Sequence, residues 1–460
     1  MNLFVIAYRN LQQRGLASFL TMLSMALGVA MVVIVLSISW LVTESFDRNS
    51  NVGYNLIVGS KGGSLQLTLN SVFYLSRPIE VVPYEEYLEL IPGKEGRRKE
   101  IERIGGRVAE PEREGLFSAY TSGKGFAIPI CLGDYFGPFR VVGTTPDFFD
   151  KLRHGPMGDK EYQFREGRNL EDCSKENGFF EAVLGSQVAR AMNRKVGDFL
   201  QTTHGDPEGE GHGEKYKIVG ILEPTGTPND RAAFINIEGF YLMDNHARVA
   251  PDLANPDDKK VQVDRLSGDD QPERLPLHQR DLTAILVKTG EPMFAVNLMW
   301  TINKRLNTQA VSPLSEIAGL LQIFVTPIRN VLLTLTVLVC LVSAVAILVS
   351  IYNSMNERRR DIAVMRALGA RRGVIMFVVL IESVMIAAVG GSLGWLAGHL
   401  LGMACSGFVE EQTGLQVGLL NTVSWQELVL IPGLILLGIL AGIIPALSAY
   451  RTDVSKNLSA

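Results

Sequence analysis

The chain has 460 residues, of which 47% are hydrophobic, and a formal net charge of −4. Nucleic acid is excluded as an expected partner, because no basic patch accompanies aromatic residues outside the apolar segments. The mean hydropathy of +0.16 hides a division, since four nearly uncharged stretches enclose one long region of mixed composition.

Residues 1–15 are predicted to form a cytoplasmic interfacial helix, with apolar side chains on one side and Asn2, Arg9 and Gln13 on the other. The apolar run that follows, residues 16–42, is far longer than the core of a signal peptide, and no clean cleavage site follows it. This run is therefore predicted to be a retained signal anchor and the first transmembrane helix.

Three further apolar stretches, 323–353, 374–405 and 425–450, are each long enough to cross a bilayer core, which takes roughly 20 apolar residues. The predicted fold class is an α-helical membrane protein with four transmembrane helices and a large α+β extracytoplasmic domain between helices 1 and 2. That domain, with a stalk, takes up residues 43–322.

Basic residues are sorted by position, and this predicts the orientation in the membrane. They gather before residue 16, in the loop 354–373 and in the tail 451–460, whereas the loop 406–424 carries Glu410 and Glu411. Both termini and the 354–373 loop are therefore expected in the cytoplasm, and the 43–322 and 406–424 regions outside.

Short strands and helices alternate in the external region, which favours an α+β domain. Strands are expected over residues 54–58, 126–131, 140–143, 182–184, 216–222, 233–237 and 282–288, and helices over 84–90, 145–152, 186–193 and 293–307. Two polar inserts, 202–215 and 251–279, are expected to be mobile surface loops.

Just before the second apolar stretch, Leu314, Ile317, Leu321 and Phe324 recur at coiled-coil spacing. This spacing predicts a stalk made with the outward continuation of the first span, and the alternative is an amphipathic helix on the membrane surface. Pro327 is expected to kink the helix nearby.

The external region contains one pair of cysteines that could form a disulfide and one pair of histidines that could bind a metal. Cys131 and Cys173 lie where a disulfide is permitted, and the sequence leaves open whether they are bridged. His204 and His212 are weak candidates for ligands of a metal such as zinc, and a solvated acidic loop is the alternative reading.

The third apolar stretch has Gly390, Gly394, Gly398 and Gly402 at four-residue intervals, a pattern typical of close helix packing within a chain or in a dimer. Glu382 in the same stretch is either a functional carboxylate or one that reaches the interface or caps a neighbouring helix. His399 is interpreted as structural.

Residues 357–370, between the second and third apolar stretches, have the pattern of a short docking helix. Ile362, Met365 and Leu368, with Ala363 and Ala367, form a narrow apolar stripe, and Gly369 is well placed to end the helix. Such a stripe can fill a groove on another protein. The alternative is a basic loop that rests on lipid headgroups.

Motifs for catalysis are absent from the sequence. No G-x-x-x-x-G-K-[ST] or H-E-x-x-H pattern occurs, and the glycine-rich stretch 59–63 lacks the spacing of a phosphate loop. Residues 390–394 match G-x-S-x-G in letters, but they lie inside an apolar stretch and form no strand-to-helix nucleophile elbow. Catalysis and cofactor binding by this chain alone therefore have no sequence support.

Together these segments resemble the FtsX-like permeases, the membrane subunits of MacB-type ABC transporters. The resemblance covers most of the chain and rests on residues 7–11, 23–36, 142–149, 165–168, 185–189, 196–198, 219–222, 357–370, 442–446 and 449–451. Asp361 departs from the family, which more often has Glu there, and the two polar inserts lie outside the family pattern.

The resemblance implies a homodimer or paired permease in the bacterial cytoplasmic (inner) membrane, bound to two ATPase subunits that hold ATP and Mg²⁺. It also implies mechanotransmission, in which ATP hydrolysis moves the stalk and the external domain during export or extraction of a substrate. MacB has a fused ATPase, so a separate ATPase is expected here. The residues that the resemblance assigns to ATPase coupling are Glu357, Asp361, Ile362, Met365, Arg366, Ala367, Leu368 and Gly369.

Three alternatives remain open at this point. The chain could be an FtsX-type regulator of an external hydrolase, a metal-linked transport component, or a membrane scaffold without an ATPase. A periplasmic partner protein is compatible with the first of these and with the transporter.

Overall fold

The computed structural model describes residues 3–50, 53–75, 78, 80–104, 110–155, 158–209, 211–243, 246–247, 274–357, 359–405, 427 and 430–451, with the side chains of 41–50, 356–361, 430–431, 449 and 451 left aside. The chain divides into a helical unit, Met1–Glu44 with Gln322–Ala460, and a sheet unit, Ser45–Leu321.

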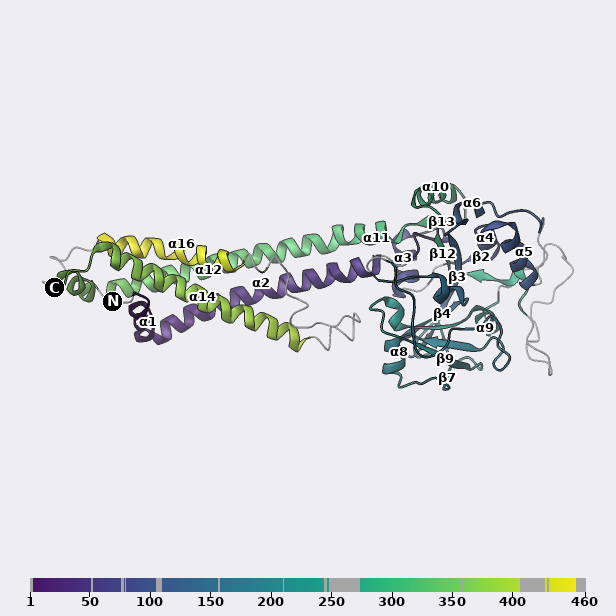
Figure 1. Cartoon of the computed structure of the whole chain (residues 1–460), viewed down its shortest axis with the longest axis horizontal. Helices are drawn as coiled ribbons and strands as arrows, with labels where there is room; N and C mark the ends of the chain where they lie inside the picture. Colours follow the sequence, from purple (N-terminus) through teal and green to yellow (C-terminus); the bar gives the residue numbers. More distant parts are fainter. Residues whose placement is uncertain are drawn as a thin grey trace. The chain divides into compact units, whose positions relative to one another are not determined.

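The helical unit consists of long apolar helices joined by shorter ones (Figure 1). Its elements are α1 (Leu3–Gln13), α2 (Gly15–Ser50), α12 (Thr326–Glu357), α13 (Arg359–Ala367), α14 (Arg372–Ala404) and α16 (Leu430–Arg451). Among the described residues, three segments are long and apolar enough to cross a membrane: Gly15–Trp40, Pro313–Met355 and Arg372–Ala404. The apolar part of α16, Pro432–Ser448, is shorter, so the fourth transmembrane helix stays a prediction.

The second of these segments contains irregular backbone near the proline that the sequence singled out. A π-helix, Leu321–Val325, joins α11 (Pro313–Leu320) to α12, and Pro327 is the second residue of α12. Proline is tolerated at the start of an α-helix, because the first turn needs no N–H partner within the helix.

The sheet unit is built on a mixed sheet with the strand order β13-β1-β12-β3-β4-β10-β6-β9-β5. The strands are β1 (Leu56–Ser60), β3 (Phe126–Phe136), β4 (Phe139–Thr144), β5 (Phe164–Gly167), β6 (Glu181–Leu184), β9 (Tyr216–Leu222), β10 (Ala232–Asn236), β12 (Ala284–Lys288) and β13 (Thr308–Val311). Short strands β7 (Phe199–Leu200) and β8 (Thr203–His204) pair with β9 and β3, and β2 (Val82–Pro83) pairs with β11 (Asp281–Leu282).

Both faces of this sheet are buried, because successive side chains of a strand point to opposite faces. In β12, Ile285 and Val287 join one core cluster, and Ala284 and Leu286 join the other. Helices and the loops between them complete both clusters, and the helices are α3 (Ser64–Phe73), α4 (Glu85–Leu88), α5 (Gly93–Ile104), α6 (Ser118–Thr121), α7 (Asp147–Lys151), α8 (Ser186–Ala191), α9 (Ile237–Leu242) and α10 (Pro292–Asn303). This double burial explains why the strands are nearly continuous apolar runs.

The first polar insert corrects the expectation of a mobile surface loop. Residues 202–204 and 211–212 pair back onto the sheet: Asp134 of β3 lies opposite His204 of β8, and Thr203 bridges to Gly211. Thr202 and His212 are buried. The second insert lies outside the described residues up to residue 273, but its end is anchored, since Leu275 and Gln279 are buried.

The residues at coiled-coil spacing that predicted a stalk differ in their burial. Ile317 of α11 is buried, whereas Leu314 and Phe324 are exposed, and α11 contacts α3 of its own unit. The pairing of the first span with this helix stays a prediction.

Candidate functional site

The short helix α13 lies between α12 and α14 and ends at a glycine. Gly369 has φ of 100°, a left-handed value that a residue with a Cβ rarely adopts. The backbone N–H of Ala370 donates to the Met365 carbonyl at 3.0 Å, and that of Leu368 donates to Val364 at 3.0 Å. These bonds satisfy the last carbonyls of α13 and fix the turn into α14, which begins at Arg372.

The predicted apolar stripe of α13 is divided between the inside and the outside of the chain. Ile362 and Ala363 are buried, and Met365 packs against the core that contains Ile362. In contrast, Leu368 is 84% exposed and Val364 is 42% exposed. Ile362 and Met365 therefore hold α13 to its own chain, which corrects the hypothesis that the whole stripe is free to fill a partner's groove.

The surface that remains available, here called the exposed face of α13, consists of Val364 and Ala367 of the helix and of Leu368, the residue that follows it. Arg366 is half-buried beside it, and the side chains of Glu357 and Asp361 lie outside the described residues. Sequence periodicity alone missed Val364, because the helical wheel does not show which side of the apolar stripe the chain itself covers.

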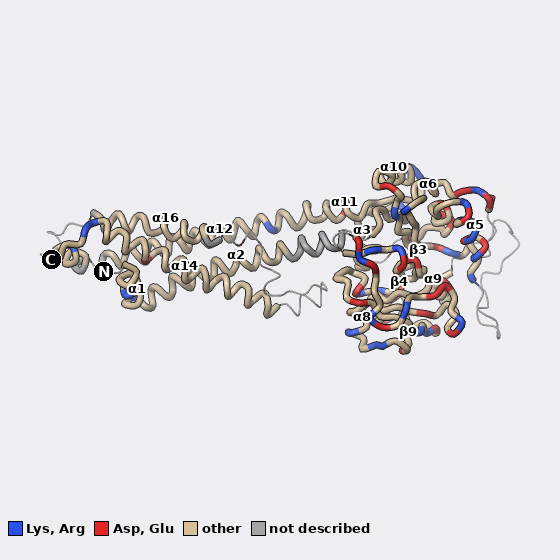
Figure 2. The backbone as a smooth tube through the Cα atoms, viewed as in Figure 1, with Lys and Arg blue, Asp and Glu red and all other residues tan. Residues whose placement is uncertain are grey.

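A cavity of about 590 Å³ lies beside this surface, lined by α1, α12, α13 and α14. Met365 of α13 and Leu368, which follows that helix, line it, together with Asn10 of α1 and Glu382 of α14. Lysine and arginine residues gather at the end of the helical unit where α1 lies, while few charged residues occur along its middle (Figure 2). The cavity and the exposed face of α13 thus form one candidate coupling site.

Glu382 is a buried carboxylate with a hydrogen-bonding partner. The Asn10 amide of α1 donates to its Oε1, and the Arg14 guanidinium donates to the Ser350 carbonyl of α12 at 2.7 Å. Polar groups in an apolar segment are stabilised by such partners. These two contacts attach α1 and the residue that follows it to the helices on either side of α13.

Three of the four glycines that recur at four-residue intervals in α14 lie against α2. A Cβ at Gly390 would lie 2.8 Å from the Met22 carbonyl oxygen, and one at Gly398 would lie 2.8 Å from Val33 Cβ. Gly394 is similarly close to Ala26 and Val29, whereas Gly402 has no neighbour within 4 Å among the described residues. Small residues therefore allow a close helix approach inside this chain, at three of the four positions.

His399 of α14 is also buried with a partner. Its Nε2 lies 2.9 Å from Oε2 of Glu427, and the indole of Trp395 donates to the same oxygen at 3.1 Å. Because the imidazole and the carboxylate satisfy each other, the structural role assigned to His399 has a physical basis.

The disulfide that the sequence left open is not formed. Cys131 and Cys173 are not bonded to each other, and the Cys131 sulfur is directed at the Tyr241 hydroxyl, 3.4 Å away, and at the Asp281 carbonyl, 3.5 Å away. The side chain of Cys131 lies in the core beneath β3, and burial raises the pKa of its thiol to about 12.

The two histidines of the first insert lie beside two residues that the sequence did not single out. His204 and His212 gather with His246, which follows α9, around Asp134 of β3. The four ligand atoms lie within 4.8 Å of one another. Asp134 lies in a β-bulge, between Leu132 and Tyr135, where the pairing of β3 with β4 changes register. Bulges redirect side chains in this way.

Comparison with known families identifies the architecture. A model described as MacB-like periplasmic core domain matches residues 18–273, more than half of the chain. A second, described as FtsX-like permease C-terminal, matches residues 333–454 and so includes α13. The chain belongs to the MacB/FtsX family of ABC transporter permeases.

Relatives of this permease are similar over most of its length. It is 23% identical over 461 residues to an uncharacterized ABC transporter permease of Methanocaldococcus jannaschii. This alignment covers 99% of this chain and 96% of that protein. An uncharacterized ABC transporter permease of Bacillus subtilis is 25% identical over 404 residues, 85% of each chain. The macrolide export ATP-binding/permease protein MacB of Bordetella avium is 33% identical, but over 133 residues, 27% of this chain and 20% of that protein.

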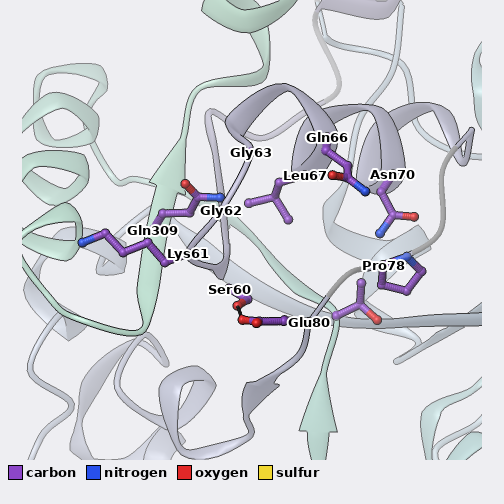
Figure 3. Close-up of a pocket in the computed structure, with 11 residues that line it drawn as sticks. Ser60, Lys61, Gly62, Gly63, Gln66, Leu67, Asn70, Pro78, Glu80 and Gln309 are labelled. Carbon is purple, nitrogen blue, oxygen red and sulfur yellow. Dashed lines mark hydrogen bonds between the residues drawn. The ribbon is translucent and has the colours of Figure 1, made fainter.

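The glycine-rich stretch of the permease lines a separate cleft of about 260 Å³ in the sheet unit (Figure 3). Lys61 Nζ donates to the carbonyls of Asn303 and Arg305, at 3.2 and 2.7 Å. The Ser60 hydroxyl donates to Glu80 at 2.8 Å. The Lys61 ammonium is therefore already hydrogen-bonded to backbone oxygens. The Glu80 carboxylate also lines the cleft and would repel an anion, so the cleft is a poor site for phosphate.

Proposed function

We propose that this permease couples ATP hydrolysis by a separate ATPase to movement of its sheet unit, by mechanotransmission. In this proposal the ATPase binds the exposed face of α13, and the sheet unit acts in the periplasm during export or extraction of a substrate. The observation that carries the proposal is that a glycine-terminated helix, α13, exposes Val364, Ala367 and Leu368 beside a cavity at the basic end of the helical unit.

The exposed face suits a docking partner. Leu368 is a large apolar side chain that is 84% exposed. Burying it in a partner's groove would stabilise the complex by about 25 cal/mol for each Å² of apolar surface removed from water. The buried face of α13, which includes Ile362, would transmit the partner's movement to α12 and α14, because close-packed interiors transmit strain. A basic loop resting on lipid would need neither the glycine cap nor the buried face.

The long helices suit transmission across a membrane. α2 has 36 residues, so it is about 54 Å long at 1.5 Å per residue, against a hydrocarbon core of about 30 Å. The basic residues near α1 favour a cytoplasmic position for that end of the helical unit. We further propose an inner-membrane location with both termini in the cytoplasm, and a permease dimer.

The test is affinity purification of the full chain from native membranes in mild detergent, with mass spectrometry of every retained protein. The wild type is expected to retain an ATPase, and Leu368→Glu is expected to lose it. Leu306→Glu is the matched control, because Leu306 is 89% exposed in the sheet unit and should leave the ATPase bound. Recovery of the wild-type chain alone, or an ATPase that stays bound to Leu368→Glu, would contradict the proposal.

Met365 is a poorer probe for this test than the sequence suggests. Its side chain packs against the core of the helical unit, so Met365→Glu would disturb the fold as well as the surface. Val364→Glu is a better second variant, because Val364 is exposed on the same helix.

A further inference from the structure

Four metal-ligand side chains from distant parts of the sequence converge in the sheet unit. Asp134 comes from β3, His204 from β8, His212 from the turn that follows, and His246 from the segment after α9. The cluster includes three of the six histidines of the chain. Its ring centroids lie 5.6 Å apart for His204 and His212, 5.1 Å for His204 and His246, and 4.9 Å for His212 and His246.

The distances to the central carboxylate fit a shared cation. His246 Nε2 lies 3.1 Å and His204 Nδ1 lies 3.4 Å from Asp134 Oδ1, and His212 Nε2 lies 3.3 Å from Oδ2. Ligands at about 2.0–2.2 Å from a tetrahedral Zn²⁺ are separated from one another by roughly 3.3–3.6 Å. The observed separations at the carboxylate are at or slightly below that range.

Two buried atoms of the cluster without hydrogen-bond partners independently favour a bound cation. The Asp134 side chain is 0% exposed, and among the described residues neither its Oδ2 nor His212 Nε2 has a hydrogen-bond partner. A buried carboxylate oxygen without a donor costs free energy. A cation between these two atoms would satisfy both of them.

We propose that Asp134, His204, His212 and His246 bind one divalent cation of the zinc class. Three imidazole nitrogens and one carboxylate oxygen suit Zn²⁺, and four protein ligands give the closed coordination of a structural site. The cation would attach the first insert and the segment after α9 to β3. The His204 side chain is 53% exposed, so the cation would enter the site from solvent on the His204 side.

The test uses the full chain, purified in detergent, stripped with a chelator and titrated with Zn²⁺ against a chromophoric competitor. The expected result is roughly one Zn²⁺ per chain. His204→Ala and His246→Ala are expected to weaken binding by more than the about 10- to 100-fold that loss of an outer-shell partner costs. His278→Ala is the matched control, because His278 lies outside the cluster, and its affinity should equal that of the wild type.

Two further measurements separate a lost ligand from a lost fold. Because the His204 side chain is half exposed, its truncation should leave the circular dichroism spectrum unchanged while Zn²⁺ binding falls. Titration with Co²⁺ should produce the visible absorption of a tetrahedral nitrogen and oxygen site, and His212→Ala should abolish it. Zn²⁺ binding that is absent from the wild type, or equal in wild type and all cluster variants, would overturn the proposal.

Discussion

Arg280 and Glu238 form a doubly hydrogen-bonded ion pair in the interior of the sheet unit. The Arg280 guanidinium donates to the two carboxylate oxygens at 3.0 and 2.6 Å, and the side chains are 0% and 1% exposed. Arg103 donates to the same carboxylate at 2.9 Å. The pair joins α9 to the residue that follows the second insert and precedes β11.

Breaking this pair should strongly destabilise the sheet unit. Arg280→Met leaves a buried carboxylate with less compensation, and such single removals cost about 3–5 kcal/mol. Thermal unfolding in mild detergent, followed by near-ultraviolet circular dichroism, measures the loss. Arg98→Met is the control, because Arg98 and Glu102 form a solvent-exposed pair at 3.5 Å and exposed pairs contribute about 0–1 kcal/mol. Equal unfolding temperatures for the two variants would contradict this prediction.

Stability should fall on acidification. Burial alone would raise the pKa of Glu238, but Arg280 and Arg103 outweigh it and hold that pKa below its usual value of 4.5. The unfolded chain therefore binds the proton more readily, and stability that is complete above pH 4.5 is lost as the pH falls through the folded-state pKa. Melting curves from pH 7 to pH 3 should show this loss, and Glu238→Gln should flatten it. A melting temperature independent of pH would refute it.

The thiol of Cys131 should resist labelling in the folded protein. Burial raises its pKa to about 12, so at neutral pH it carries almost no reactive thiolate. Iodoacetamide at neutral pH should modify Cys173, which is partly exposed, before Cys131. Peptide mass spectrometry in the presence and absence of denaturant measures both. A peptide linked through Cys131 and Cys173 would contradict the absence of a disulfide between them.

Two glycines of α14 should differ in their tolerance of a larger side chain. Gly394→Val would place its side chain against the Ala26 backbone of α2, whereas Gly402→Val meets no described atom within 4 Å. Overpacking costs about 1–3 kcal/mol, and more where backbone must move. Size-exclusion profiles after heating should show aggregation of the Gly394 variant alone. Aggregation of both variants would indicate that a partner covers Gly402.

Local patterns were predictable from the sequence where a residue acts within its own element. The strand Tyr216–Leu222 was predicted with the bounds that the structure has, and the helix before Gly369 ends as its left-handed glycine requires. The helix α5 was missed because nearly all its residues are polar. It is held by Ile101 and Ile104, which pack in the core, and by the buried Arg97, which donates to the carbonyls of Glu110, Pro111 and Arg113.

The cation cluster shows why contacts between residues that are distant in the sequence could not be predicted. His204 and His212 are close in sequence, so they could be considered together, but Asp134 and His246 join them only through the pairing of β3 with β8 and the course of the chain after α9. Nothing local marks Asp134, whose position depends on a bulge. The division of the α13 stripe likewise depends on α12 and α14, which cover Ile362.

The outer strand β5 has a consequence for how this domain behaves at high concentration. A sheet edge offers unpaired backbone groups to other chains. In β5 the pairing with β9 is shifted between Phe164 and Glu166, Gly167 has φ of 77°, and Arg165 and Glu166 are exposed. A bulge, a left-handed glycine and charged side chains interrupt the regular edge, so the strand is a poor template for intermolecular β-pairing and aggregation.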